Sequence, residues 1–116
     1  MPGLTQKTCK PCEVGVKPLD ANEAQTLMAQ LTGWALVEDA KTIQQTFRFK
    51  DYDQTVAFVT AVAWIAHQED HHPDMELIYN RCLINYSTHA IGGLSENDFI
   101  CAAKIDTLLK TDHPTG

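Results

Sequence analysis

The sequence predicts an α+β fold in which a four-stranded antiparallel sheet carries helices packed on one face. Three observations lead to this prediction. Capping signals, in which an acidic or hydroxyl residue precedes a Glu, Gln or Asp by three positions, begin three segments with helical apolar spacing. Segments typical of strands lie in two pairs between these helical segments. The order is therefore αββαββα, and no pattern indicates a parallel crossover.

The first helix and the first pair of strands occupy the segment between residues 20 and 50. Asp20 and Glu23 form a capping signal, an apolar stripe follows, and Gly33 stands where a helix would stop. Strands are predicted at residues 34–37 and 42–50. The second alternates apolar and polar residues, which is typical of a strand with one buried and one solvated face.

The longest helix is predicted at residues 53–70, after a capping signal at Asp51 and Gln54, and it is apolar on most of its sides. Such a helix must be covered on more than one face, and the sheet can cover only one. We therefore expect a homodimer or a homotetramer, with a second copy of the chain covering another face. Pro73 ends the helix, because the residue before a proline is kept out of the α conformation.

The second pair of strands is predicted at residues 75–79 and 82–87, with Asn80 and Arg81 as a two-residue hairpin turn. Ser95 then begins a last helix that runs to about residue 110. Trp64 and Tyr79 are expected in the core rather than against a ligand. We predict one domain at residues 19–112, preceded by a flexible leader at residues 1–18.

Composition argues against several classes of function. Nine Lys and Arg against fifteen Asp and Glu give a formal net charge of −6, and the basic residues do not gather into a patch. Binding to nucleic acid or to an anionic membrane surface is therefore disfavoured. The longest mostly apolar stretch, residues 56–66, is well short of the ~20 residues that a bilayer span needs. With no secretory signal evident, a cytoplasmic location is expected.

The four cysteines are expected to be free thiols in a reducing compartment. Cys9 and Cys12 form a CxxC pattern without a second pair, inside the predicted leader. Half of a zinc site, a redox pair and a leader without function all remain open for it.

Four of the five histidines fall in one short part of the sequence: His67, His71, His72 and His89. His67 and His71 are four residues apart, which places them on one face of a helix. His72 leaves that helix, and His89 follows the last strand. If the helix packs on the sheet, its C-terminal end can meet the end of the last strand. The two would then form a pocket at the rim of the sheet that contains several imidazoles.

Three interpretations of these histidines compete. They could be surface residues at loop junctions. They could bind zinc, although Gln68 stands where an HExxH motif would need Glu. They could act in general acid–base catalysis, because imidazole titrates near neutrality. No nucleophile motif accompanies them, so proton transfer without a covalent intermediate fits best.

The spacing of these histidines and their neighbours resembles the signature of the pterin-4a-carbinolamine dehydratases. The resemblance covers residues 19–110, and the αββαββα order is similar to that family's fold. His67 stands where some members have an acidic residue, and the leader lies outside the resemblance. The residues that carry it are His71-His72-Pro73, Tyr79, Ser87-Thr88-His89, Gly93-Leu94-Ser95 and Asp98.

The resemblance implies a dehydratase that converts 4a-hydroxytetrahydrobiopterin to quinonoid dihydrobiopterin and water. This reaction recycles the pterin cofactor of aromatic amino-acid hydroxylases, so the resemblance implies a functional link to such a hydroxylase. It implies no metal or organic cofactor for the dehydratase itself. The implied catalytic residues are His71, His72 and His89, with His71 and His89 as the acid–base pair and His72 chiefly orienting the pterin.

The implied substrate-binding residues are Asp70, His72, Ser87, Thr88 and Asp98. Two of these have simpler interpretations. Asp98 also completes the capping signal of Ser95, with or without orienting a histidine. Asp70 could hold a histidine tautomer or the pterin, or it could be a solvated residue at a helix end.

A function of another class also follows from the resemblance. In animals, members of this family also act as dimerisation partners of a homeodomain transcription factor, so the fold could serve as an interaction module. The presence of all three histidines and Asp98 favours catalysis, because an interaction surface does not need them.

Overall fold

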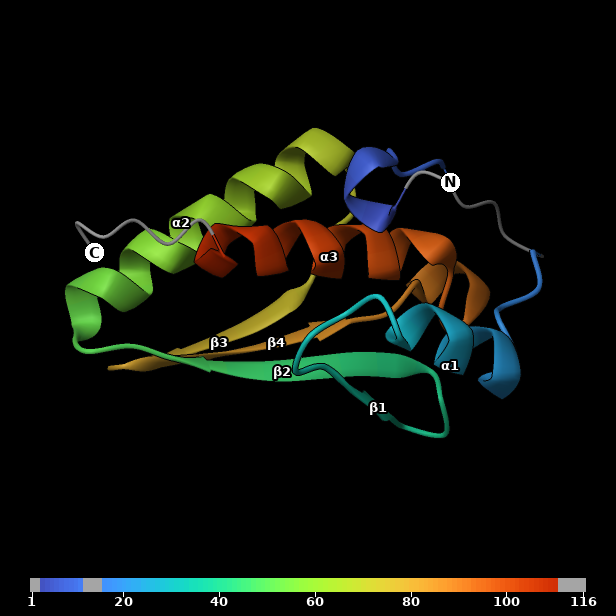
Figure 1. The fold of residues 1–116 in the computed structure, drawn as a ribbon, viewed down its shortest axis with the longest axis horizontal. Coiled ribbons are helices and arrows are strands. Elements are labelled where there is room, and N and C mark those ends of the chain that lie inside the picture. The colour runs from blue at the N-terminus through green and yellow to red at the C-terminus, as the bar shows by residue number, and fades with distance from the viewer. Residues whose placement is uncertain (1–2, 12–15, 111–116) are drawn as a thin grey trace.

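A computed structural model describes residues 3–11 and 16–110. Helices lie across one face of a four-stranded antiparallel sheet whose strand order is β1-β2-β4-β3 (Figure 1). This confirms the predicted α+β architecture. The elements are α1 (Ala21–Met28), β1 (Ala35–Val37), β2 (Thr42–Arg48), α2 (Tyr52–Glu69), β3 (Asp74–Ile78), β4 (Arg81–Tyr86) and α3 (Glu96–Lys110), with short 3-10 turns η1 (Leu4–Gln6) and η2 (His89–Ile91).

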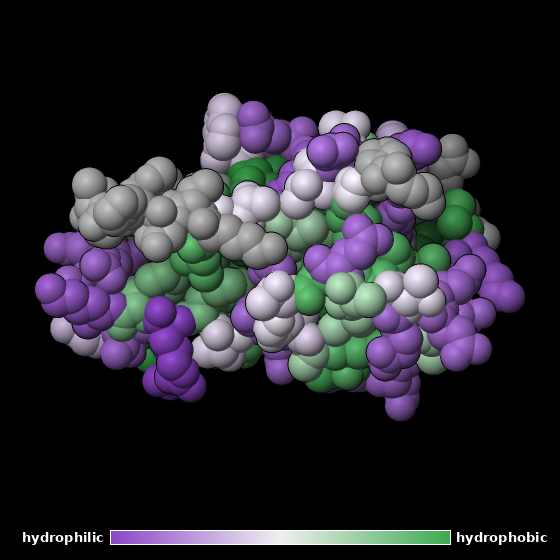
Figure 2. All heavy atoms as spheres, viewed as in Figure 1, coloured by the Kyte–Doolittle hydropathy of each residue, from purple (hydrophilic) through white to green (hydrophobic). Residues whose placement is uncertain are grey.

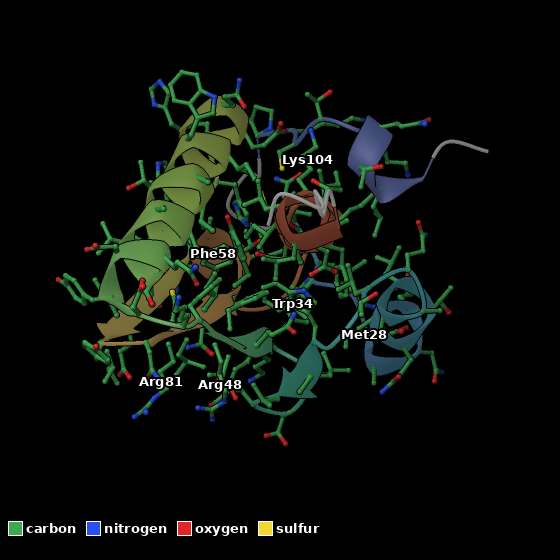
Figure 3. All side chains as sticks on the ribbon, turned by 60° about the vertical axis from the view of Figure 1, so that its left-hand side comes forward. Met28, Trp34, Arg48, Phe58, Arg81 and Lys104 are labelled. Atoms are coloured by element: carbon green, nitrogen blue, oxygen red, sulfur yellow. The ribbon has the colours of Figure 1, made fainter. Side chains whose placement is uncertain are left out.

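The core lies between the sheet and the helices. Alternate residues of the two central strands are buried against the helix layer, as the period of two in a strand requires. In Figure 3, Phe58 and Trp34 point into this layer, whereas Arg48 and Arg81 point away from the helices on the other face of the sheet. The buried strand residues are Ile43, Phe47, Cys82, Ile84 and Tyr86.

The predicted helix starts are where the capping signals place them. The Asp20 side chain accepts from the Glu23 backbone N–H at 2.8 Å, and the Glu23 side chain accepts from the Asp20 N–H at 2.9 Å. Asp51 accepts from the Gln54 N–H at 2.9 Å. These carboxylates satisfy N–H groups that have no partner inside the first turn.

The predicted hairpin turn was wrong by one residue. Ile78 pairs with Arg81, so the two turn residues are Tyr79 and Asn80. Tyr79 takes a positive φ of 30°, and the Asn80 carbonyl accepts from the Phe49 N–H at 2.8 Å. Contacts from another part of the chain thus fix the turn, and the local sequence does not reveal them.

The expectation that Trp64 and Tyr79 lie in the core was also wrong, because their side chains are 59% and 63% exposed. The buried stripe of α2 is narrow, and Trp64 lies beside it. Tyr79 occupies the hairpin turn, where it stacks on Tyr52 with ring centroids 6.3 Å apart. The buried residues of α2 are Thr55, Phe58, Val62 and Ala66.

The segment 3–11 of the predicted leader packs against α3 and contributes Leu4 to the core. Cys12 lies outside the described residues, and the flexibility of the leader and the domain boundary at residue 19 stay predictions. Figure 2 shows hydrophilic side chains gathered at both ends of one face, with apolar side chains surfacing between them. Among the described residues, no helix has the length and apolar character needed to cross a bilayer.

Candidate active site

A cavity of about 600 Å³ opens where the C-terminal end of α2 meets the residues after β4. Its walls come from three parts of the chain: the N-terminal segment, the end of α2, and the loop from β4 to α3. The lining residues are Cys9, Lys10, Pro11, Gln68, Glu69, Asp70, His71, His72, Ser87, Thr88, His89, Ala90 and Asn97.

The end of α2 directs His71 into this site. The helix stops at Glu69, and Asp70 takes the left-handed conformation with φ 52° and ψ 44°. The chain therefore turns sharply, and the His71 N–H bonds the Ala66 carbonyl at 3.1 Å. The same turn separates His71 from the face of α2 that carries His67, so the expected i, i+4 pairing of these two histidines was wrong.

His71 is held on two sides. Its ring stacks on Tyr86, with centroids 5.4 Å apart and planes 12° apart, and the Tyr86 hydroxyl donates to the His71 carbonyl at 3.1 Å. Its Nε2 donates to Asp98 Oδ1 at 2.6 Å, which is short for such a bond and typical of a charge-assisted contact. Only 12% of the His71 side chain is exposed.

Asp98 is fully buried and connects His71 to the start of α3. Its second oxygen, Oδ2, accepts from the Thr88 hydroxyl at 2.8 Å and from the Ser95 N–H at 3.0 Å. Asp98 therefore caps α3 and orients His71 at the same time. It does not line the cavity, so its contact with the site runs through His71 and Thr88.

This arrangement changes the acidity of His71. Burial lowers the pKa of His71, but the hydrogen bond and the negative charge of Asp98 outweigh burial, so the pKa stands above its usual value. The contact with Asp98 thus favours the protonated form of His71 compared with an imidazole that has no such partner. A positioned imidazolium of this kind can donate a proton to a bound molecule.

The opposite wall comes from the residues after β4. Ser87, Thr88 and His89 follow the last strand, and a bridge between Thr88 and Gly93 closes the loop with an N–H···O distance of 2.7 Å. His89 begins η2 and is exposed toward solvent. A smaller cavity of about 350 Å³ adjoins the first and shares Ser87 and His89 with it.

The structure therefore brings most of the predicted site residues to one cavity. Asp70, His71, His72, Ser87, Thr88 and His89 all line it, and Asp98 lies behind it. His67 lies outside, on exposed α2 surface, with its ring 5.5 Å from that of Trp64. Within residues 3–11 and 16–110, no three His, Cys, Asp or Glu side chains are arranged to hold a metal ion.

Sequence reasoning missed the wall formed by the N-terminal segment. Cys9, Lys10 and Pro11 line the cavity, whereas the leader was expected to lie outside the site. The Cys9 N–H donates to Glu69 Oε1 at 2.8 Å, and Asn97 holds Lys10. The CxxC pattern was visible in the sequence, but nothing in it indicated that this segment crosses the cavity.

A cavity with several imidazoles, one of them held by a buried carboxylate, is chemically suited to proton transfer. Comparison with known proteins gives the family. The family profile described as "Pterin 4 alpha carbinolamine dehydratase" matches residues 17–108. A Nitrosomonas eutropha protein named "Putative pterin-4-alpha-carbinolamine dehydratase" is 62% identical over 107 residues, which cover 91% of this chain and 93% of that protein. The chain belongs to the pterin-4a-carbinolamine dehydratase family.

Solved structures show the same fold. A Brucella melitensis protein described as a transcriptional coactivator/pterin dehydratase aligns with a TM-score of 0.75 and 30% identity, covering 79% of this chain and 98% of that one. A pterin dehydratase-like protein described as a RuBisCO assembly factor aligns with a TM-score of 0.60 and 21% identity, covering 72% and 96% of the two chains. The second likeness concerns the fold alone.

Proposed function

We propose that this protein is a dehydratase that converts 4a-hydroxytetrahydrobiopterin to quinonoid dihydrobiopterin and water. The observation that carries the proposal is the His71–Asp98 pair, with its 2.6 Å contact, in a cavity that His72 and His89 also line. Family membership supports a pterin as the substrate. The cavity volume of about 600 Å³ falls in the range typical of small-molecule sites.

The chemistry requires two proton transfers. The hydroxyl on C4a leaves as water only after it gains a proton, and N5 must lose one. We assign the acid to His71, because Asp98 holds its pKa above the usual value and so favours the protonated ring. We assign the base to His89, which lies on the other wall of the cavity and is exposed. Transfer by positioned groups of this kind contributes ~10²–10⁴-fold in rate.

The remaining wall residues have supporting roles in this scheme. His72 is adjacent to the proposed acid and exposed in the cavity, so it binds and orients the pterin. Asp70 and Ser87 offer a carboxylate and a hydroxyl for the polar edge of the ring. Thr88 also lines the cavity, although its hydroxyl already bonds Asp98. Asp98 is a positioning residue, because it acts through His71.

Neither transfer needs a metal ion, because one protonated and one neutral imidazole supply both steps. Turnover is therefore expected to survive treatment with a chelator. The product pterin connects the reaction to aromatic amino-acid hydroxylation, for which this step would regenerate the cofactor in the cytoplasm.

An interaction module is the alternative function. The description of the Brucella melitensis structure as a transcriptional coactivator favours it, as do the exposed apolar side chains of α2, among them Val56 and Trp64. A purely binding role predicts a folded protein without turnover. The carbinolamine assay therefore separates the two functions.

Stopped-flow measurement on chemically generated 4a-hydroxytetrahydrobiopterin tests the proposal. Dehydration should be faster with the protein than in buffer, after the uncatalysed rate is subtracted, and should saturate with substrate. His72→Ala should raise KM more than it lowers kcat, because binding shared by ground and transition states leaves kcat unchanged. A folded wild-type protein that does not accelerate dehydration would exclude the dehydratase function.

A further inference from the structure

Two thiols from distant parts of the chain face each other beside the cavity. Cys9 Sγ lies 3.6 Å from Cys101 Sγ, although the residues are 92 positions apart in the sequence. Cys101 is fully buried in α3, whereas Cys9 is partly exposed and lines the cavity. Both are free thiols in the structure. The proposed dehydration uses neither sulfur.

The backbone around Cys9 is fixed on both sides of the thiol. The Cys9 N–H donates to Glu69 Oε1 at 2.8 Å. The Asn97 side chain accepts from the Lys10 N–H at 3.0 Å and donates to the Lys10 carbonyl at 2.5 Å. Cys9 Sγ also lies 3.6 Å from the Asn97 carbonyl oxygen. These contacts come from the end of α2 and the start of α3, so they keep the Cys9 sulfur close to Cys101.

The surroundings also favour a reactive pair. Hydrogen bonding from Cys9 lowers the pKa of Cys101 below that of an ordinary thiol, although burial opposes this, and the Tyr86 hydroxyl adds to the lowering. The thiolate is the nucleophilic form of cysteine. The hydrogen bond to Cys101 and burial raise the pKa of Cys9, so Cys101 is the favoured thiolate and Cys9 keeps the proton.

We propose that Cys9 and Cys101 are a modification site at which a peroxide oxidant forms a reversible disulfide. The bond would tie residues 9–11 to α3 and so fasten one wall of the cavity. Small peroxides can reach Cys9 through the cavity, whereas Cys101 is enclosed. The proposal concerns the thiols alone and does not depend on the dehydratase function.

The reaction balances with one hydrogen peroxide. The Cys101 thiolate takes the proton of Cys9 as the Cys9 sulfur attacks one peroxide oxygen, the O–O bond breaks, and hydroxide leaves. Cys9 becomes a sulfenic acid, and the hydroxide takes the proton from Cys101 to form water. The Cys101 thiolate then attacks the Cys9 sulfur, the S–O bond breaks, and the second oxygen leaves as water after protonation. The two thiols lose two electrons, and the peroxide gains them.

Peptide mapping of the full folded chain tests the proposal. The protein is treated with hydrogen peroxide, remaining thiols are blocked with a maleimide, and the unreduced protein is digested with trypsin and a Glu-specific protease. Cleavage after Glu96 separates Cys82 from Cys101, whereas Cys9 and Cys12 stay in one peptide because trypsin does not cut before Pro11. We expect a crosslink between that peptide and the Cys101 peptide, which dithiothreitol reverses, while Cys82 stays a thiol.

Variants assign the crosslink to its sulfurs. Cys12→Ser should retain it, whereas Cys9→Ser and Cys101→Ala should each abolish it. Cys9 is partly exposed, so Cys9→Ser should fold even if the Cys101 variant does not. A disulfide within the N-terminal peptide, between Cys9 and Cys12, would overturn the proposal. So would oxidation of Cys9 to sulfinic acid without any crosslink.

Discussion

At the scale of single residues, Asp98 connects the folding of α3 to the chemistry of the cavity. One oxygen serves the start of the helix and the Thr88 hydroxyl, and the other holds His71. A fully buried carboxylate is stable only when its oxygens are hydrogen-bonded, and Asp98 meets this condition with three donors. The helix start and the orientation of the imidazole therefore depend on one side chain.

Replacement of this carboxylate by an amide should lower the pKa of His71. Asp98→Asn keeps the size of the side chain but removes the charge that opposes the effect of burial. The ¹H–¹³C NMR titration of the His71 ring should therefore move to lower pH. Glu96→Gln, at the partly exposed start of α3, removes a carboxylate that pairs with Lys7 rather than His71, so this matched control should leave the titration in place. An unchanged His71 titration in Asp98→Asn would contradict the account of this pair.

The raised pKa of His71 also makes stability depend on pH. A group with a raised pKa in the folded state stabilises the fold fully below its unfolded value, about 6.5 for histidine. This contribution disappears as the pH rises through the folded-state pKa. The free energy of unfolding should therefore fall above about pH 6.5, and urea denaturation at several pH values measures it. In His71→Gln the free energy of unfolding should depend less on pH over this range. If the wild-type protein and this variant lose stability in parallel as the pH rises, the linkage to His71 is refuted.

At the scale of elements, the end of α2 decides where the histidines lie. Asp70 in the left-handed conformation turns the chain, and His71 and His72 then line the cavity while His67 stays on the exposed surface. Asp and Asn adopt this conformation more readily than other residues with a side chain, and glycine adopts it without strain. The identity of residue 70 therefore matters for the turn and, in our proposal, for the substrate.

Asp70→Gly separates these two roles. The backbone conformation is retained, so the melting temperature should change little, whereas KM for the carbinolamine should rise because the carboxylate is lost. Asp70→Asn should behave in the same way, and Asp70→Val should lower the melting temperature, because a β-branched residue is strained there. Kinetics and thermal denaturation of the three variants provide the comparison. An unchanged KM in Asp70→Gly would leave Asp70 with the turn alone.

The sequence predicts elements well where the determining contacts are local. Asp20 and Asp51 cap the helices that their spacing indicates, and these bonds span three residues. The hairpin turn at Tyr79 differs from the prediction because Phe49, far away in the sequence, bonds Asn80. The wall at Cys9 was missed for the same reason, since its contacts with Glu69 join distant segments.

At the scale of the whole molecule, exposed apolar surface gathers on α2 and on the edge strand β3. Tyr52, Val56, Ala63 and Trp64 are exposed at spacings that place them on one side of α2. On β3, Leu77 and Ile78 are exposed next to an unpaired strand edge. Uncovered strand edges and apolar faces are typical sites of association. This surface supports the proposed homodimer or homotetramer.

Association should therefore be measurable in solution. Light scattering at micromolar concentration should give a mass well above the 12.9 kDa of one chain. Trp64→Glu should reduce that mass if the α2 surface forms the interface, because it places a charge in an apolar contact. Gln25→Glu, on the exposed side of α1, is the control. A mass near 12.9 kDa for the wild-type protein would refute the association.

The most direct test of the central claim is the dehydration rate of the two proposed proton-transfer variants. His71→Ala and His89→Ala should each lower kcat by ~10²–10⁴-fold in stopped-flow assays on 4a-hydroxytetrahydrobiopterin, after subtraction of the uncatalysed reaction. The double variant should be little worse than the more damaged single one, because the two residues act as a unit. His67→Ala, on the exposed face of α2 outside the cavity, should keep the wild-type kcat. If His71→Ala and His89→Ala both fold and both retain wild-type kcat, histidine acid–base catalysis in this cavity is contradicted.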